Sequence, residues 1–347
     1  MVSFSDTSEN TNFLLPLEPL FRGLTLIAVG SRGRTQEEVL RLFACENADE
    51  LFSYYRRGYP QFAKLGNENK FYGALSWERH PPYPKFVEFS SKHFSMPFLI
   101  GNYDSINNWV TGITSRKISD TLSAYPLGSS YIMYLMGTYS LPSFGELLSL
   151  RQSTFHLGHG ATIRVDFLEF NANLSYVQDQ YAQTVFIEQG SDGKDGNIIA
   201  LVLPNSKVIS GDNNHLISFK YLSNLFDSYT TAIPREIDVS LPKVNFVDKG
   251  SLKKNLVNAG LKGVFDPARA RLSLVSNQGI HFSDVLFYFQ FSIPHCELPV
   301  VSKIPTRDNG VVFPPLQLIY DRPFYLVSLN KKTGLPNLIA KIVNPTQ

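Results

Sequence analysis

Residues 24–43 read LTLIAVGSRGRTQEEVLRLF, two helical patterns joined by a short stretch that contains glycine and arginine. The first pattern covers 19–29, where apolar side chains recur at helical spacing and Pro19 suits a first helical turn. Gly30 is a typical helix stop. Thr35 stands three residues before Glu38, the spacing of a capping box, so we expect a second helix with Thr35 as its cap.

The rest of the chain carries further helical patterns and many strand patterns. Residues 104–122 have apolar side chains at helical spacing, and 251–260 resemble a short helix that ends at Gly260. Apolar or alternating runs predict strands over 131–139, 198–203, 237–247, 280–293, 324–329 and 338–343. Helices lead and strands dominate the end, which indicates an α+β fold. No repeat or linker divides the chain, so we expect a single domain over 1–347.

Composition narrows the class of protein. The 347 residues are 43% hydrophobic and 13% aromatic, as in an ordinary globular protein. The net charge is +2 and no basic run is present, so we expect no nucleic-acid partner and no basic helix face for a glycosaminoglycan. No run of apolar residues has the length of a membrane span. The first residues lack the pattern of a secretory signal, which favours an intracellular protein.

No constellation of residues predicts catalysis or a metal site. His156 and His159 have the spacing of a metal pair, but no cluster of further ligands follows, and we interpret them as part of a strand–turn–strand connection. His295 and Cys296 are neighbours, which in an extended chain point to opposite faces and cannot form a catalytic pair. We therefore expect no enzyme, no catalytic residue, no metal and no cofactor.

Two minor patterns remain. Cys45 and Cys296 are too few for a disulfide framework, and nothing in their spacing indicates that they pair. Asn173 begins an Asn-Leu-Ser sequon, a possible glycosylation site of a kind that commonly occurs by accident.

Five stretches carry longer motifs, in a fixed order along the chain. Gly30, Arg32, Gly33, Thr35 and Glu38 are the marked positions of the first, and the others are INNWVTGITSRKISDTL (106–122), TFHLGHGATIRV (154–165), LPKVNFVDKGSLKKNLVNAGLKGVFDPARARLS (241–273) and YDRPFYLVSLNKKTGLPNLIAKIVNP (320–345). Together they resemble the serpin family of serine protease inhibitors over nearly the whole chain.

The resemblance implies a fold of three β-sheets, called A, B and C, with about eight helices and an exposed reactive-centre loop. Too few residues precede the first motif for the family's first helix, so we expect that helix to be missing, or the true start to lie upstream. Because many family members are secreted, an extracellular location also stays open.

The resemblance makes residues 294–314 the equivalent of the reactive-centre loop. In the family, a protease cleaves this loop, and the loop then inserts as a new central strand of sheet A and distorts the attached protease. The family hinge has Gly and Thr followed by small residues. Aligned on Ser283-Asp284-Val285, the hinge positions here are Glu297, Leu298, Pro299, Val300, Val301, Ser302 and Lys303.

These residues suit an inserting strand poorly. Pro299, and Pro305 two residues after the hinge, lack the N–H that a central strand donates to its neighbours. The family also has a polar cluster under sheet A, where this chain has Leu14-Leu15-Pro16-Leu17-Glu18, and Phe287 stands at a histidine position. In the family, the strands of sheet A part above this cluster, at a seam where the loop enters. We interpret this seam as apolar here and unable to open.

Two functions therefore compete. The first is a non-inhibitory serpin, a monomer that acts by binding a protease or another protein. The alternative is an active inhibitor that uses 294–314 as bait, with the scissile bond among Arg307, Asp308, Asn309, Gly310 and Val311.

Overall fold

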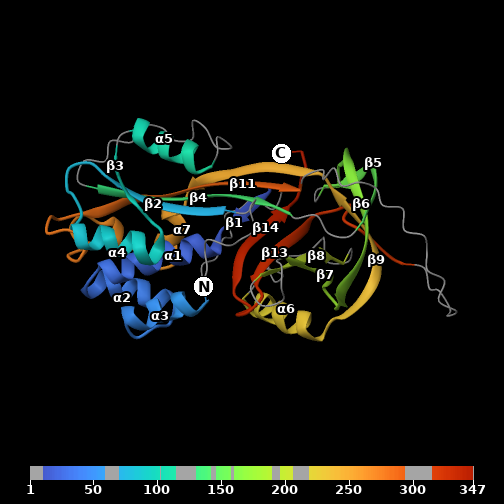
Figure 1. Cartoon of the computed structure of the whole chain (residues 1–347), viewed down its shortest axis with the longest axis horizontal. Helices are drawn as coiled ribbons and strands as arrows, with labels where there is room; N and C mark the ends of the chain where they lie inside the picture. Colours follow the sequence, from blue (N-terminus) through green and yellow to red (C-terminus); the bar gives the residue numbers. More distant parts are fainter. Residues whose placement is uncertain are drawn as a thin grey trace. The chain divides into compact units, whose positions relative to one another are not determined.

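The computed structural model describes residues 11–58, 70–101, 103–114, 130–141, 146–157, 160–189, 196–205, 219–293 and 315–346 (Figure 1). These residues form a mixed α+β structure, which confirms the fold class expected from the sequence. The chain divides into two compact units, one mainly from Pro16–Tyr139 and Val247–Gln290, the other mainly from Ser140–Phe246 and Phe291–Gln347. The expectation of a single domain stays a prediction.

The first unit contains most of the helices. They are α1 (Leu17–Gly30), α2 (Gly33–Leu42), α3 (Ala48–Gly58), α4 (Pro84–Phe94), α5 (Tyr103–Ile113) and α7 (Lys253–Asn258), with a 3-10 turn at Gly263–Phe265. Helix α1 is buried on nearly all sides, which explains why its sequence is apolar over most of its length. Its residues 24–30 and the following helix α2 are the pair that the 24–43 pattern predicted.

A five-stranded sheet has the strand order β10-β11-β4-β2-β3. Its members are β10 (Val244–Ser251), β11 (His281–Ile293), β4 (Ser130–Ser140), β2 (Lys70–Trp77) and β3 (Phe98–Ile100). Strand β2 is antiparallel to β4 and parallel to β3. Figure 1 shows α1 to α4 on one face of this sheet and α5 on the other.

A nine-stranded sheet lies in the second unit. Its path is β1 (Phe13–Leu15), β14 (Pro336–Ile342), β13 (Phe324–Asn330), β8 (Asn197–Pro204), β7 (Ala182–Gln189), β6 (Thr162–Gln178), β9 (Ile233–Pro242) and β12 (Leu316–Ile319), and β5 (Glu146–His156) also pairs with β6. One edge of the long strand β6 binds first β5 and then β7. The described strands therefore form two hydrogen-bonded sheets, where the resemblance implied three. Helix α6 (Phe219–Thr231) packs on this sheet, with the rings of Tyr229 and Phe186 5.6 Å apart.

The capping box expected at Thr35 is wrong. Helix α2 begins two residues earlier, at Gly33, and no side chain caps it. The Thr35 hydroxyl accepts a hydrogen bond from the backbone N–H of Arg271 at 3.1 Å. The Glu38 carboxylate accepts from the N–H groups of Lys262 at 2.8 Å and Gly263 at 2.6 Å. Both polar side chains therefore fasten a distant segment to α2 instead of closing the start of their own helix.

Other element boundaries also differ from the sequence expectation. The alternating run 237–247 belongs to two strands, because β9 ends at Pro242 and β10 begins at Val244. The helix expected over 104–122 is α5, which ends at Ile113, and residues 115–129 lie outside the described residues. The short helix expected before Gly260 is α7, and Gly260 has the positive φ of 106° that suits a residue after a helix end.

We expect the substitution Glu38→Ala to lower the free energy of unfolding by about 2–5 kcal/mol, because two backbone N–H groups would lose their acceptor in a buried setting. Urea denaturation followed by circular dichroism measures this. Glu37→Ala on the same helix is the matched control. Its ion pair with Arg41 is exposed, so a change within about 0.5 kcal/mol is expected. Equal effects of the two substitutions would contradict the role of Glu38.

Candidate functional site

The candidate site is the seam between β4 and β11, where the family resemblance places loop insertion. The Ser283 hydroxyl donates to the Tyr131 carbonyl at 3.3 Å, and the hydroxyls of Ser292 and Ser140 lie 3.2 Å apart. Both contacts join residues 152 positions apart, so the two strands run parallel. The two strands are neighbours in the sheet, with no strand between them.

The segment that follows β11 lies outside the described residues. The described chain stops at Ile293 and resumes at residue 315, shortly before β12. The expected loop 294–314 falls in this interval. So do all the hinge and cleavage residues named from the sequence, which are Glu297, Leu298, Pro299, Val300, Val301, Ser302, Lys303, Arg307, Asp308, Asn309, Gly310 and Val311.

Strand β4 is buried on both of its faces. One face packs on α1, where Gly23 leaves no room for a β-carbon against the Met133 sulfur. The opposite face forms a cluster with Ile106 and Val110 of α5, to which β4 contributes Ile132, Tyr134 and Met136. Leu286 and Tyr288 of β11 pack on the same cluster. Helix α5 therefore covers both strands of the seam.

Aromatic rings fill the space beside Gly137 of β4. The rings of Phe71 and Phe289 meet edge to face at 5.8 Å, and Phe71 is stacked with Tyr139 at 6.4 Å. A β-carbon on Gly137 would lie 2.6 Å from the Lys70 carbonyl oxygen and 2.8 Å from the Phe289 ring. The glycine thus allows rings from β2 and β11 to pack directly against β4.

A buried ion pair lies next to these rings. Glu18 and Arg22, on consecutive turns of α1, are only 1% and 2% exposed, and the Arg22 Nε lies 3.1 Å from the Glu18 Oε1. Arg22 also donates to the Phe71 carbonyl at 3.2 Å and to the Phe94 carbonyl at 3.3 Å. It therefore links α1 to the first residues of β2 and to the end of α4.

The ion pair shows that the stretch expected to be apolar under the sheet includes a buried polar group. Glu18, which stands where the family has a serine, carries a buried carboxyl group. Leu14 and Leu15 do not join it, because they lie on β1 and pair with β14 in the other unit. Sequence reasoning missed Arg22. The available signal was its i,i+4 spacing from Glu18 in an otherwise apolar helix.

Burial dominates the electrostatics of this pair. It raises the pKa of Glu18 from its ordinary 4.5 to about 7, against the opposing effect of the Arg22 charge. Tyr55, 2% exposed, packs against Phe94 with ring centroids 4.9 Å apart, and burial also raises the pKa of its hydroxyl. The region under the sheet is therefore poorly solvated, and it holds an arginine next to a carboxyl group whose ionisation is disfavoured.

The other residues singled out from the sequence are dispersed. Phe287 is half-buried on β11, close to Gly250 of β10. Asn173 is exposed on β6 opposite Glu236, and His156 ends β5, while His159 lies outside the described residues. Cys45 is a free thiol, and Cys296 also falls in the interval after Ile293. Among the described residues of this group, only Phe287 lies on a strand of the seam.

The described part of the chain holds no group of three or more His, Cys, Asp or Glu side chains placed to bind a metal ion. None of its helices combines the length and the apolar character needed to cross a membrane.

Comparisons with known proteins give a consistent result. A family model described as serpin (serine protease inhibitor) matches residues 3–345. A serine protease inhibitor of Cyanea capillata is 24% identical over 69% of this chain and 64% of its own length, and the corticosteroid-binding globulin of Mus musculus is 22% identical over 70% and 59%. The chain thus spans less than two thirds of either relative. A crystal structure of native protease nexin-1 with heparin superimposes with a TM-score of 0.80 at 18% identity, covering 97% of this chain and 93% of that one.

We expect Gly137→Ala to destabilise the protein by about 1–3 kcal/mol, because the added methyl group overpacks the ring cluster. Gly112→Ala is the control. A β-carbon there meets nothing within 4 Å, and the helical position should gain up to about 1 kcal/mol. Thermal unfolding of both variants tests this. A neutral Gly137→Ala would mean that the rings move apart easily.

The Glu18 pKa predicts an unusual pH dependence. Because folding raises this pKa from 4.5 to about 7, the contribution of Glu18 to stability is complete below pH 4.5 and is lost as the pH rises through 7. Glu18→Gln removes this loss. The free energy of unfolding of the variant, relative to the unsubstituted protein, should therefore increase between pH 4.5 and 7.

Glu188→Gln is a control of opposite sign. Hydrogen bonds from Lys331 and Tyr229 hold the Glu188 pKa below its ordinary value, so its contribution is present above pH 4.5 and is lost as the pH falls. Relative to the unsubstituted protein, this variant should lose stability as the pH rises toward 4.5, and the difference should then stay nearly constant up to pH 7. A flat difference for Glu18→Gln across the range would contradict the raised pKa.

Proposed function

This chain belongs to the serpin family, and we propose that it is a non-inhibitory member that binds a protein partner. One observation carries the proposal. The residues available to enter the seam between β4 and β11, those after Ile293, include Glu297, Pro299 and Pro305. The proposed role of this protein is binding, not catalysis.

The parallel arrangement of β4 and β11 sets strict demands on an inserted strand. A chain that turns back after Ile293 would run antiparallel to both neighbours and would need to hydrogen-bond on both edges. Pro299 and Pro305 are six residues apart, so their missing N–H groups would face the same neighbouring strand. Each loss costs about 1 kcal/mol net, and more where the opposing carbonyl stays unpaired.

Side-chain alternation adds a second difficulty. In a regular strand Pro299, Lys303 and Pro305 would share one face, and Val300 and Ser302 the other. Since β4 is buried on both faces, the Lys303 ammonium group would have to leave water whichever way the strand entered. An unpaired charge in such a setting is strongly unfavourable.

The packing of the seam also favours a sheet that stays closed. Separating β4 from β11 would remove the contact of Phe289 with Phe71 and with Gly137. Apolar area exposed in this way costs roughly 25 cal/mol for each Å². The backbone hydrogen bonds that an inserted strand forms with both neighbours normally offset such a loss. Here two positions of that strand, Pro299 and Pro305, have no N–H group to donate.

The names of two relatives state different functions. The Mus musculus relative is named for binding a corticosteroid, whereas the Cyanea capillata relative is named as a protease inhibitor. The alternative for this chain is an inhibitor cleaved between Arg307 and Val311. Arginine is the residue type that trypsin-like proteases select, which would favour Arg307 as the bait. The following experiment separates the two.

We expect limited proteolysis within 294–314 to change the melting temperature by less than about 3 °C, on the order of 1 kcal/mol. The matched variant carries Glu297→Gly, Pro299→Ala and Pro305→Ala. If these residues are what prevents insertion, nicking this variant should raise its melting temperature by more than about 10 °C. Calorimetry before and after nicking measures both.

The same protein should then be incubated with trypsin-like, elastase-like and cathepsin-like proteases. We expect each enzyme to digest the segment as an ordinary substrate. A complex that survives SDS electrophoresis, or a large rise in melting temperature for the unsubstituted protein, would overturn the proposal and establish the inhibitory alternative.

A further inference from the structure

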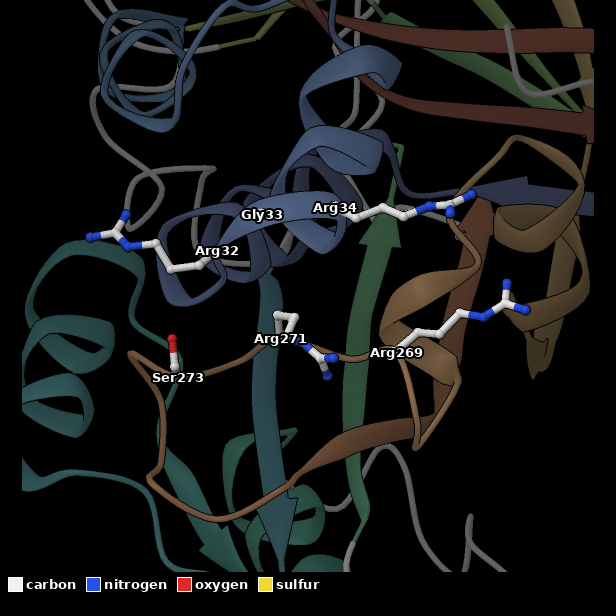
Figure 2. Close-up of a pocket in the computed structure, with 6 residues that line it drawn as sticks. All are labelled: Arg32, Gly33, Arg34, Arg269, Arg271 and Ser273. Atoms are coloured by element: carbon white, nitrogen blue, oxygen red, sulfur yellow. The ribbon is translucent and has the colours of Figure 1, made fainter.

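An arginine-lined pocket lies at the start of α2 in the first unit (Figure 2). Its volume is about 490 Å³, and its lining comes from two segments far apart in the sequence: Arg32, Gly33, Arg34, Arg269, Arg271 and Ser273. All four arginines are exposed. The sequence showed no basic run because each segment supplies only two of them.

Backbone contacts hold the two segments in place. The Arg32 N–H donates to the Arg271 carbonyl at 2.9 Å, and the Arg271 N–H donates to the Thr35 hydroxyl at 3.1 Å. The buried Glu38 carboxylate binds the N–H groups of Lys262 and Gly263 just before the second segment. The pocket walls are therefore positioned by the fold and do not depend on a ligand.

The arginines are only partly neutralised. Arg34 pairs with Glu38 at 3.3 Å and Arg269 with Asp266 at 3.1 Å, in each case through Nε. Arg271 donates through Nη1 to the carbonyl groups of Ala268 and Ala270, which carry no net charge. Four guanidinium groups against two carboxylates leave two positive charges in excess.

Figure 2 shows how the guanidinium groups lie. Those of Arg34 and Arg269 extend toward the same side of the pocket, that of Arg271 is directed along its own segment toward Arg269, and Arg32 points the opposite way. Arginine binds phosphate oxygens through paired N–H groups, and the Nη atoms of Arg34 and Arg269 lie beyond their carboxylate-bound Nε atoms. We therefore assign the main contacts to Arg34, Arg269 and Arg271.

The beginning of α2 adds to the positive potential. No side chain caps this ten-residue helix, and its first turn contains no acidic residue. Gly33 adopts a positive φ of 54°, and a β-carbon there would meet nothing within 4 Å, so the backbone is open to close approach. The first N–H groups of a helix lack partners within the helix and attract anions.

We propose that this pocket binds a phosphate monoester group of a small molecule. Such a group carries a charge of about −1.5 to −2 at neutral pH, which matches the excess of positive charge in the pocket. A sulfate ester carries less charge and should bind more weakly. The pocket shares no lining residue with the β4–β11 seam, so its test does not depend on the non-inhibitory role.

Isothermal titration at low ionic strength with myo-inositol hexakisphosphate provides the test, with sucrose octasulfate as the sulfate probe. The double variant Arg269→Gln/Arg271→Gln should bind the phosphate probe about 10- to 100-fold more weakly, because two charge-assisted contacts are lost. The control is Arg41→Gln/Arg151→Gln, which removes the same charge from side chains that are 74% and 56% exposed outside the pocket. It should change affinity by less than about two-fold, since long-range attraction is screened.

Inorganic phosphate should also displace the probe, and circular dichroism checks that each variant is folded. If Arg269→Gln/Arg271→Gln does not fold, Arg34→Gln replaces it, with a smaller expected loss of about 10-fold because one of the three main contacts is removed. The proposal is overturned if the phosphate probe does not bind, if control and pocket variants weaken equally, or if the octasulfate binds as tightly as the phosphate probe.

Discussion

The buried ion pair of Glu18 and Arg22 is the constraint on which the helical side of the five-stranded sheet depends. Removing two charges from water is costly, and the mutual attraction offsets this only if the remaining hydrogen-bonding groups are satisfied. Arg22 meets part of this condition, because its Nη atoms donate to the carbonyl groups of Phe71 and Phe94 and to Glu18, while its Nε and the Glu18 Oε1 face each other as an ion pair without a well-aligned hydrogen bond. Helix α1, strand β2 and the end of α4 must therefore keep one arrangement, and the aromatic packing beside Gly137 is built on it.

Regular periodic patterns made much of the fold predictable. The apolar period of α1, the alternation in β11 and the buried runs of β8 and β13 each depend on neighbours close in sequence, and they lie where the patterns indicated. The capping box failed because Thr35 and Glu38 bind residues 236 and 224 or more positions away. A local pattern cannot show that a distant backbone segment competes for the same side chains.

The candidate site also has some features that the sequence could reveal and others that it could not. The residues of the interval after Ile293 could be judged from sequence, since a proline lacks a donor wherever it lies. Arg22 and the arginine pocket could not, because their significance comes from groups that only the folded chain brings together. The comparison with nexin-1 establishes the fold, and the chemistry of the individual residues distinguishes this chain within it.

The contact between Glu38 and Gly263 has a consequence for how the first unit assembles. It joins residues 225 positions apart, so forming it closes a very large loop, and the entropy of that closure must be offset before the contact contributes. Non-local contacts of this kind slow folding, whereas the helices of 24–43 need only local ones. Helices α1 and α2 can thus form early, and the segment 262–273 docks late. An unfolded or partly folded chain has the arginines but no pocket.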